Sequence, residues 1–340
     1  MMRSMSLKIL PHVVTFALIL ALFVVMLGAY TRLTDAGLGC PDWPGCYGHM
    51  VLPTVKNKLM DAQQQYPQLP IESRKAWTEM AHRYVAGTLA LLVLGIGICV
   101  LRARNRGASL PWLVPSVLIL LIIFQALLGM WTVTLKLLPV VVMGHLLGGV
   151  LIFASLVYLR MQLSSVASEN LPCWRNWIGL GIIIVFCQIA LGGWVSSNYA
   201  GVACIGFPQC NGQWWPVLHF SKGFNLFSPV GANYQGGLLD NNVRLTIQFI
   251  HRIGAFVTAA YVLILSSSLL ICGRANALRK VAALAIGLII IQFALGVANV
   301  VYLLPLWVAV AHNGTAALLL AIMFVMRYLA TGGAINAGQH

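Results

Sequence analysis

The chain has 340 residues, of which 60% are hydrophobic and only 8% are charged. Soluble proteins carry about 25% charged residues, so this composition, with a mean hydropathy of +0.87, excludes secreted mini-proteins, disordered chains and cytosolic enzymes. Lys and Arg number 21 against 7 Asp and Glu, a balance that in a soluble protein would indicate nucleic acid binding. In a membrane protein basic residues first report orientation, and we therefore expect no nucleic acid partner.

Eight apolar segments are long enough to cross a bilayer, which takes about 20 residues in a helix. Two long polar loops, 33–80 and 197–244, follow the first and the fifth segment, whereas the other links are short. Loops of this length are usually functional. The sequence predicts an all-α polytopic membrane protein with eight transmembrane helices, at 12–32, 81–101, 112–132, 139–160, 176–196, 245–270, 281–301 and 306–329.

Basic residues indicate the orientation of these segments. The short links 133–138 and 302–305 on one face hold only Lys136. By the positive-inside rule we expect both termini in the cytoplasm and both long loops outside. About eleven residues precede the first segment, too few for a transit peptide, so we expect a bacterial inner membrane with periplasmic loops. The residues that favour this orientation lie at the opposite ends of the segments: Arg3, Lys8, Arg102, Arg104, Arg106, Arg160, Arg175, Arg274, Arg279, Lys280 and Arg327.

The two halves of the chain repeat one another. Four spans return the chain to its starting side, so we expect two parallel four-helix bundles, residues 1–165 and 166–340, related by an axis along the membrane normal. Constant offsets of 164, 169 and 167 residues relate three groups: Gly28, Cys40 and Cys46 to Gly192, Cys204 and Cys210; His82 and Arg83 to His251 and Arg252; Gln125, Gly129 and His145 to Gln292, Gly296 and His312.

Each even-numbered segment carries one histidine: His82, His145, His251 and His312. All four lie at similar depth below the outer boundary, so the two in each half can face each other. Zinc takes three or four protein ligands, and no Asp, Glu or Cys lies at that depth. Heme iron needs only two axial ligands, so the pattern predicts two bis-His heme sites, one per half. The alternative is four histidines that hydrogen-bond between helices.

Arginines lie near the outer ends of the spans, at Arg32, Arg83, Arg244 and Arg252. Arg83 and Arg252 each follow a candidate heme ligand and are our candidates to pair with heme propionates. The alternative is ordinary snorkelling of the side chain to the interface.

Glu79 is the one acid that stands a helical turn before an intramembrane histidine, His82, and this spacing puts both on one face. Gln248 takes its place before His251. The asymmetry predicts chemistry in the N-terminal half and a supporting heme in the C-terminal half. The alternative is a first-turn acid favoured by the helix dipole.

Cysteines pair by spacing in the two long loops, Cys40 with Cys46 and Cys204 with Cys210. Outer loops of a bacterial inner membrane face an oxidising space, and thiols split between distant loops lack the zinc pattern. We therefore expect two intraloop disulfides. Whether the first is a staple or exchanges electrons stays open.

A Gln-x-x-Leu-Gly element recurs at Gln125, Gln188 and Gln292. We interpret it as a packing glycine with an interhelical amide.

Together, the element Glu79-x-x-His82-Arg83, the second pair His251-Arg252, the paired loop cysteines and the duplicated eight-span layout, with His145 and His312, resemble the heme A synthases over nearly the whole chain. The resemblance implies oxidation of the C8 methyl of heme O to the formyl of heme A, by successive hydroxylations, for terminal oxidase assembly.

Site roles also follow from the resemblance. It implies that His82 and His145 flank the substrate heme, that Glu79 takes part in catalysis and that Cys40 and Cys46 form the functional loop disulfide. The implied ligands of a heme b cofactor are His251 and His312. The implied partners are heme O, heme O synthase and oxidase assembly factors. A membrane electron acceptor is also implied, but the resemblance identifies neither this acceptor nor the source of the oxygen.

Two other functions would use the same histidines. A di-heme electron-transfer protein gives no reason for Glu79 to be matched by Gln248. A heme transporter or chaperone would be indifferent to that carboxylate.

Overall fold

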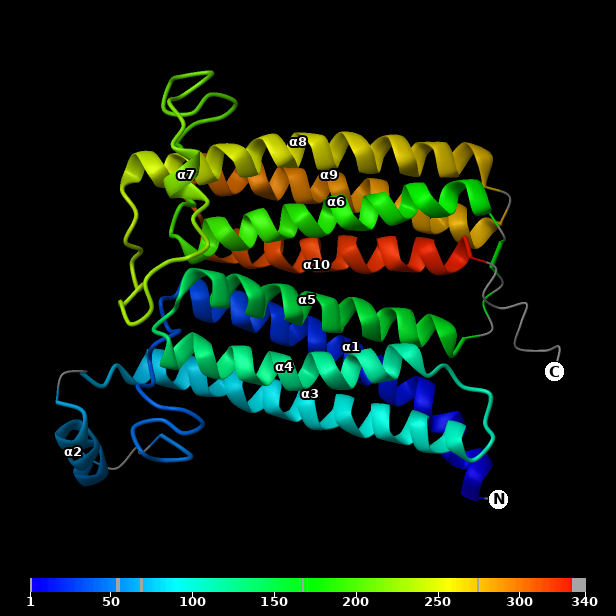
Figure 1. Ribbon diagram of the computed structural model, residues 1–340, viewed down its shortest axis with the longest axis horizontal. Coiled ribbons are helices and arrows are strands. Elements are labelled where there is room, and N and C mark those ends of the chain that lie inside the picture. The colour runs from blue at the N-terminus through cyan, green and yellow to red at the C-terminus, as the bar shows by residue number, and fades with distance from the viewer. Residues whose placement is uncertain are drawn as a thin grey trace.

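The computed structural model describes residues 2–52, 56–67, 70–164, 166, 168–169, 171–273 and 275–331. This part of the chain is built from helices joined by irregular loops (Figure 1). The helices are α1 (Met2–Leu33), α2 (Lys56–Gln65), α3 (Ser73–Asn105), α4 (Leu113–Thr134), α5 (Pro139–Gln162), α6 (Pro172–Ser197), α7 (Phe220–Gly223), α8 (Asn241–Cys272), α9 (Asn276–Val301) and α10 (Leu306–Leu329).

Eight of these helices are long and apolar enough to cross a membrane, which confirms the predicted number of spans. The predicted starts of the second and sixth spans were too late, because α3 begins at Ser73 and α8 at Asn241. Their first turns are polar, so hydropathy does not reveal them although they are helical. The two long loops are shorter than predicted for the same reason, and they contain the short helices α2 and α7.

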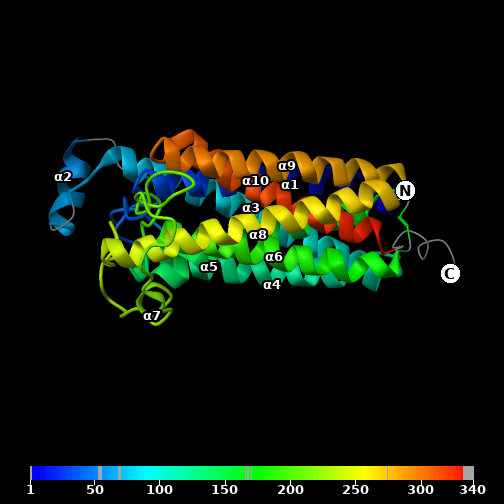
Figure 2. The ribbon, with the colours of Figure 1, turned by 90° about the horizontal axis from the view of Figure 1, so that it is seen from above.

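The spans pack as two groups of four. Helices α1, α3, α4 and α5 contact one another in a ring, and so do α6, α8, α9 and α10. The groups meet where α10 contacts α1 and α5, and where α5 contacts α6 (Figure 2). Half of the apolar window of α10 is buried, against 17–33% in the other spans. Small residues such as Ala309, Gly314 and Ala317 let its neighbours approach closely.

The two ends of the molecule differ. The start of α1, the short link 106–112, the end of α5 and the end of α10 lie at one end (Figure 1). The two disulfide loops, α2 and α7 lie at the other. Most of the basic residues that we used for orientation lie at the first end, but Arg274 and the side chains of Arg3 and Lys8 lie outside the described residues.

Both predicted disulfides are confirmed: Cys40 is bonded to Cys46, and Cys204 to Cys210. All four sulfur-bearing residues are buried. Each disulfide is followed by a single antiparallel bridge, between Cys46 and His49 in the first loop and between Cys210 and Gln213 in the second. The two loops therefore form small, closed caps at the end of the bundle.

An arginine ties each cap to the helix beneath it. Arg83 of α3 donates to the carbonyls of Asp42 at 2.9 Å and Gly45 at 2.5 Å. Arg252 of α8 donates to the carbonyls of Gly206 at 2.8 Å and Gln209 at 3.1 Å, and also to that of Cys204. The planar guanidinium presents several donors in a fixed fork, which a lysine ammonium does not.

We expect Arg252→Lys to loosen the second cap. Hydrogen bonds from a charged group contribute about 1.5–3 kcal/mol each, so the Cys204–Cys210 disulfide should be reduced at least about tenfold faster by a membrane-impermeant phosphine. Timed alkylation followed by peptide mass spectrometry measures the rate. Arg244→Lys is the matched control, because Arg244 binds the carbonyls of Leu239 and Gly237 outside the disulfide segment. Equal rates in the two variants would contradict this anchoring role.

Candidate functional site

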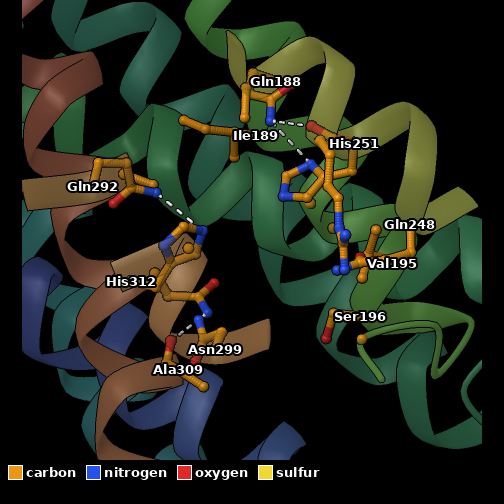
Figure 3. Close-up of a pocket in the computed structure, with 18 of the residues that line it drawn as sticks. Gln188, Ile189, Val195, Ser196, Gln248, His251, Gln292, Asn299, Ala309 and His312 are labelled. Atoms are coloured by element: carbon orange, nitrogen blue, oxygen red, sulfur yellow. Dashed lines mark hydrogen bonds between the residues drawn. The ribbon is translucent and has the colours of Figure 1, made fainter. Parts of the chain in front are cut away.

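A cavity of about 360 Å³ lies between α6, α8, α9 and α10, beside the C-terminal end of α1. His251 of α8 and His312 of α10 line it from opposite sides (Figure 3). Most other lining residues are apolar, among them Ile189, Ile289 and Leu319. The second predicted histidine pair therefore shares one largely apolar chamber.

The side-chain amides of three glutamines contact three of the four histidines, through the ring or the backbone carbonyl. Gln188 Nε2 donates to the His251 carbonyl at 2.9 Å and lies 3.1 Å from its Nδ1. Gln292 Nε2 lies 3.2 Å from His312 Nε2, and the Thr315 hydroxyl donates to the Gln292 oxygen.

In the first half Gln125 Nε2 donates to the His145 carbonyl at 2.7 Å. The predicted interhelical role of these amides is confirmed, but their histidine partners were not predicted. Their position one turn before the glycine that faces each histidine is the sequence signal that could have revealed this contact.

Each histidine ring packs against a glycine on a neighbouring helix. A Cβ atom added at any of these glycines would lie 2.9–3.2 Å from the ring, closer than most real Cβ contacts. A larger residue would therefore push the imidazole aside. The pairs are Gly28 with His82, Gly129 with His145, Gly192 with His251 and Gly296 with His312.

The first histidine pair is brought together as predicted. The rings of His82 on α3 and His145 on α5 have centroids 6.3 Å apart and are tilted by 37°. In the described part of the chain no amide contacts the His82 ring, and Val24 stands where the repeat would place the counterpart of Gln188. The two halves therefore hold their first histidine differently.

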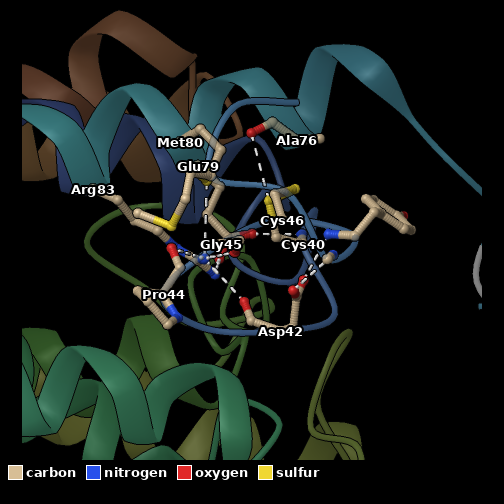
Figure 4. Close-up of a disulfide and its surroundings, with 12 residues drawn as sticks. Cys40, Asp42, Pro44, Gly45, Cys46, Ala76, Glu79, Met80 and Arg83 are labelled. Atoms are coloured by element: carbon tan, nitrogen blue, oxygen red, sulfur yellow. Dashed lines mark hydrogen bonds and ion pairs between the residues drawn. A yellow bond between two sulfur atoms is a disulfide. The ribbon is translucent and has the colours of Figure 1, made fainter. Parts of the chain in front are cut away.

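Glu79, on α3 one turn before His82, lies against the first disulfide cap (Figure 4). Glu79 is only 5% exposed to solvent. One carboxylate oxygen accepts the Cys40 N–H at 2.8 Å, and the other pairs with Arg83. The carboxylate is thus directed at the cap, although the residue stands one turn before His82.

Gln248, the counterpart of Glu79, is equally buried but makes different contacts. It lines the cavity of His251 and His312. Its side-chain oxygen is buried without a hydrogen-bond partner among the described residues. Glu79 therefore binds the first cap through the Cys40 N–H, whereas the oxygen of Gln248 makes no such bond to the second cap among the described residues.

Two arginines border the cavity. Arg252 lines it while holding the second cap. Arg32, from the end of α1, donates to the Ser196 carbonyl at 2.6 Å and stacks over the Tyr199 ring at 3.8 Å. The Nε atoms of both arginines are buried without a partner in the described part of the protein. The chamber in the second group of helices is therefore bordered by a cation from the first.

The donor set suits a heme better than a bare metal ion. Among the described residues, no three His, Cys, Asp or Glu side chains gather as ligands for a metal ion. Two imidazoles in an apolar chamber are what a planar iron porphyrin requires. The Nδ1 of His312 is buried and lacks a hydrogen-bond partner within the described chain, which also fits a ligand-binding role.

Comparison with known proteins agrees with this arrangement. Residues 12–324 match the COX15-CtaA family, described as cytochrome oxidase assembly protein. A heme A synthase of Shewanella oneidensis is 44% identical over 324 residues, which cover 94% of this chain and 96% of that protein. Heme A synthases of Caulobacter vibrioides and Rhizorhabdus wittichii are 28% and 26% identical, over 88% and 90% of this chain and 89% of each relative.

The family match extends over nearly all of the chain, and residues 12–324 span the positions of all four histidines, both disulfide caps and Glu79. The chain therefore belongs to the heme A synthase family of cytochrome oxidase assembly proteins.

Proposed function

We infer that this protein is a membrane-bound oxidoreductase that converts heme O to heme A by oxidising the C8 methyl of the porphyrin to a formyl. The observation that carries the inference is the unequal pair of otherwise matching histidine sites, with buried Glu79 beside one and Gln248 beside the other. A protein that only transferred electrons or carried heme would need no such difference. Heme A synthase is also the name of the relatives described above.

In this proposal His82 and His145, in the half formed by residues 1–165, hold the iron of the substrate heme O. Their centroid separation of 6.3 Å supports it. Two imidazoles on opposite sides of one metal, with each nitrogen about 2 Å from it, would have ring centroids at a comparable distance.

His251 and His312, in the half formed by residues 166–340, would hold a heme b cofactor. Such a heme supplies one-electron transfer, which the reaction needs because conversion of a methyl to a formyl removes four electrons overall. The apolar lining excludes water, and the amides of Gln188 and Gln292 orient the two imidazoles. Arg32 and Arg252 place positive charge at the rim, where propionates would pair with it.

Glu79 is the proposed catalytic acid–base residue on the substrate side. Oxidation of a C–H bond releases protons, and a buried carboxylate in this position can accept them. The Cys40 N–H and Arg83 fix the carboxylate. The Cys40–Cys46 disulfide closes the loop that presents this N–H, so it acts on the reaction by positioning Glu79.

The proposed location is the inner membrane of a bacterium, with both termini in the cytoplasm and both disulfide caps in the periplasm. The basic residues at the end of the bundle where α1 begins support this orientation. Heme O synthase would supply the substrate from within the bilayer, and oxidase assembly factors would receive the product. The electron acceptor would be a membrane component.

We expect Glu79→Gln to lower heme A formation at least about 100-fold, the usual scale of general acid–base catalysis, while bound heme b stays at the wild-type level. The test is extraction of hemes from membranes supplied with heme O. Glu72→Gln is the matched control, because this acid is exposed at the start of α3 and its carboxylate pairs with Lys75. Unchanged heme A in Glu79→Gln would eliminate the proposed role.

His251→Ala and His312→Ala should each abolish the low-spin heme spectrum of the protein purified without heme O, because one of the two imidazoles that would hold the heme is lost. His219→Ala, in the exposed outer loop, should leave the spectrum unchanged. Survival of the spectrum in both cavity variants would refute the C-terminal heme site.

The orientation can be tested with a phosphatase that needs disulfides and is active only outside the cytoplasm. Fusion after Phe227, which is 92% exposed in the second outer loop, should be active. Fusion after Gly107, in the link between α3 and α4, should be inactive. The reverse pattern would show that the proposed orientation is wrong.

A further inference from the structure

Three phenylalanine rings close one side of the cavity that contains His251 and His312. Phe207 comes from the second disulfide cap, Phe256 from α8 and Phe293 from α9, and all three line the cavity. The ring centroids of Phe256 and Phe293 are 5.2 Å apart, and Phe207 lies 6.2 and 6.3 Å from them. Phe256 is 52% exposed on the membrane-facing side of α8. The trio therefore stands between the chamber and the lipid.

The first half has a different set of residues at the corresponding positions. The offsets that relate the cysteines, the first histidines and the Gln-x-x-Leu-Gly elements assign Phe207 to Trp43, Phe256 to Gly87 and Phe293 to Ala126. Gly87 and Ala126 lie on the adjacent helices α3 and α4. The two large rings that meet between α8 and α9 are thus replaced by a hydrogen atom and a methyl group.

The space at these positions is open. A Cβ atom added at Gly87 would have no heavy atom within 4 Å. Both Gly87 and Ala126 are exposed, and within the described residues Trp43 stacks on no other ring. Exposed side chains near this gap include the apolar Phe124 and Leu127 of α4, and the hydroxyl of the neighbouring Thr88 is hydrogen-bonded to the Tyr84 carbonyl. Arg83 stands one turn before Gly87 on α3, but its guanidinium is bound by the first cap, so the gap suits an apolar chain.

We propose that Gly87 and Ala126 form a lateral window through which the prenyl tail of the substrate heme extends into the lipid. In the C-terminal half the phenylalanine trio closes the equivalent opening, so that half retains a heme without a tail. This proposal rests on the function proposed above. It assigns the choice between a prenylated and an unprenylated heme to two pairs of residues, Gly87 and Ala126 against Phe256 and Phe293.

The physical argument is that a prenyl chain already dissolved in lipid gains nothing from a closed apolar wall. A site open to the bilayer lets the porphyrin bind between the histidines while the chain stays in lipid. A site closed by stacked rings would have to open its wall to admit the same chain. The closed site therefore excludes the prenylated heme sterically and accepts the heme without a tail.

The test is the double variant Gly87→Phe/Ala126→Phe, purified from cells that make heme O. The heme O plus heme A content, measured against heme b by extraction and mass identification, should fall at least about tenfold, the scale expected for a misfitted apolar pocket. The heme b absorption should remain, because the trio is untouched. Leu91→Phe/Leu120→Phe is the matched control, since these residues lie on the same helices and are 75% and 67% exposed to lipid.

The reverse change tests the other half of the proposal. In a His145→Ala background, which removes a ligand of the substrate site, Phe256→Gly/Phe293→Ala should carry heme O in place of part of its heme b. Retention of heme b alone would refute discrimination by the trio.

The outcomes separate this proposal from the proposed function. If the wild-type protein makes no heme A from heme O, the proposed function fails. If the wild-type protein makes heme A and the double variant binds and converts heme O equally well, only the window is refuted. Loss of heme b from the double variant would indicate misfolding. In that case the smaller double variant Gly87→Leu/Ala126→Leu takes its place, and the ratio of heme O plus heme A to heme b tests the window.

Discussion

A polar group in the hydrocarbon region of a membrane must find its partner within the protein, and this constraint explains how the few polar side chains of the spans are arranged. Glu79 binds Arg83 and the Cys40 N–H, and the glutamine amides bind histidine-bearing positions on neighbouring helices. The Glu79–Arg83 pair lies within α3, and each of the other contacts joins a helix to a cap or to another helix. The polar residues therefore fix the relative positions of the spans as well as forming the site.

The two halves of the protein share one structural arrangement but form two different sites. Each half presents two imidazoles packed on glycines beneath a disulfide cap that an arginine holds. The proposed difference in function depends on a few residues that differ between the halves. Glu79, the proposed acid–base residue, stands where the other half has Gln248. Small residues replace Phe256 and Phe293 at the proposed opening to the lipid. The shared arrangement would keep the two hemes at similar depth, which favours electron transfer between them.

Much of this structure could be predicted from the sequence, because apolar length reveals spans and equal spacing reveals the disulfides. The polar first turns of α3 and α8 escaped prediction, since hydropathy does not distinguish a polar helix from a loop. Gln188 and Gln292 were predicted to act between helices, but their histidine partners were not predicted. These contacts depend on the rotation of one helix against another, which periodicity within a single helix does not specify.

Formation of heme A by the purified protein tests the central claim most directly. The protein would be expressed with and without a source of heme O, and its extracted pigments would be identified by mass. We expect heme b alone without heme O, and heme b together with heme A when heme O is supplied. Recovery of unaltered heme O and no oxidised product, from a protein with its heme b spectrum intact, would contradict the claim.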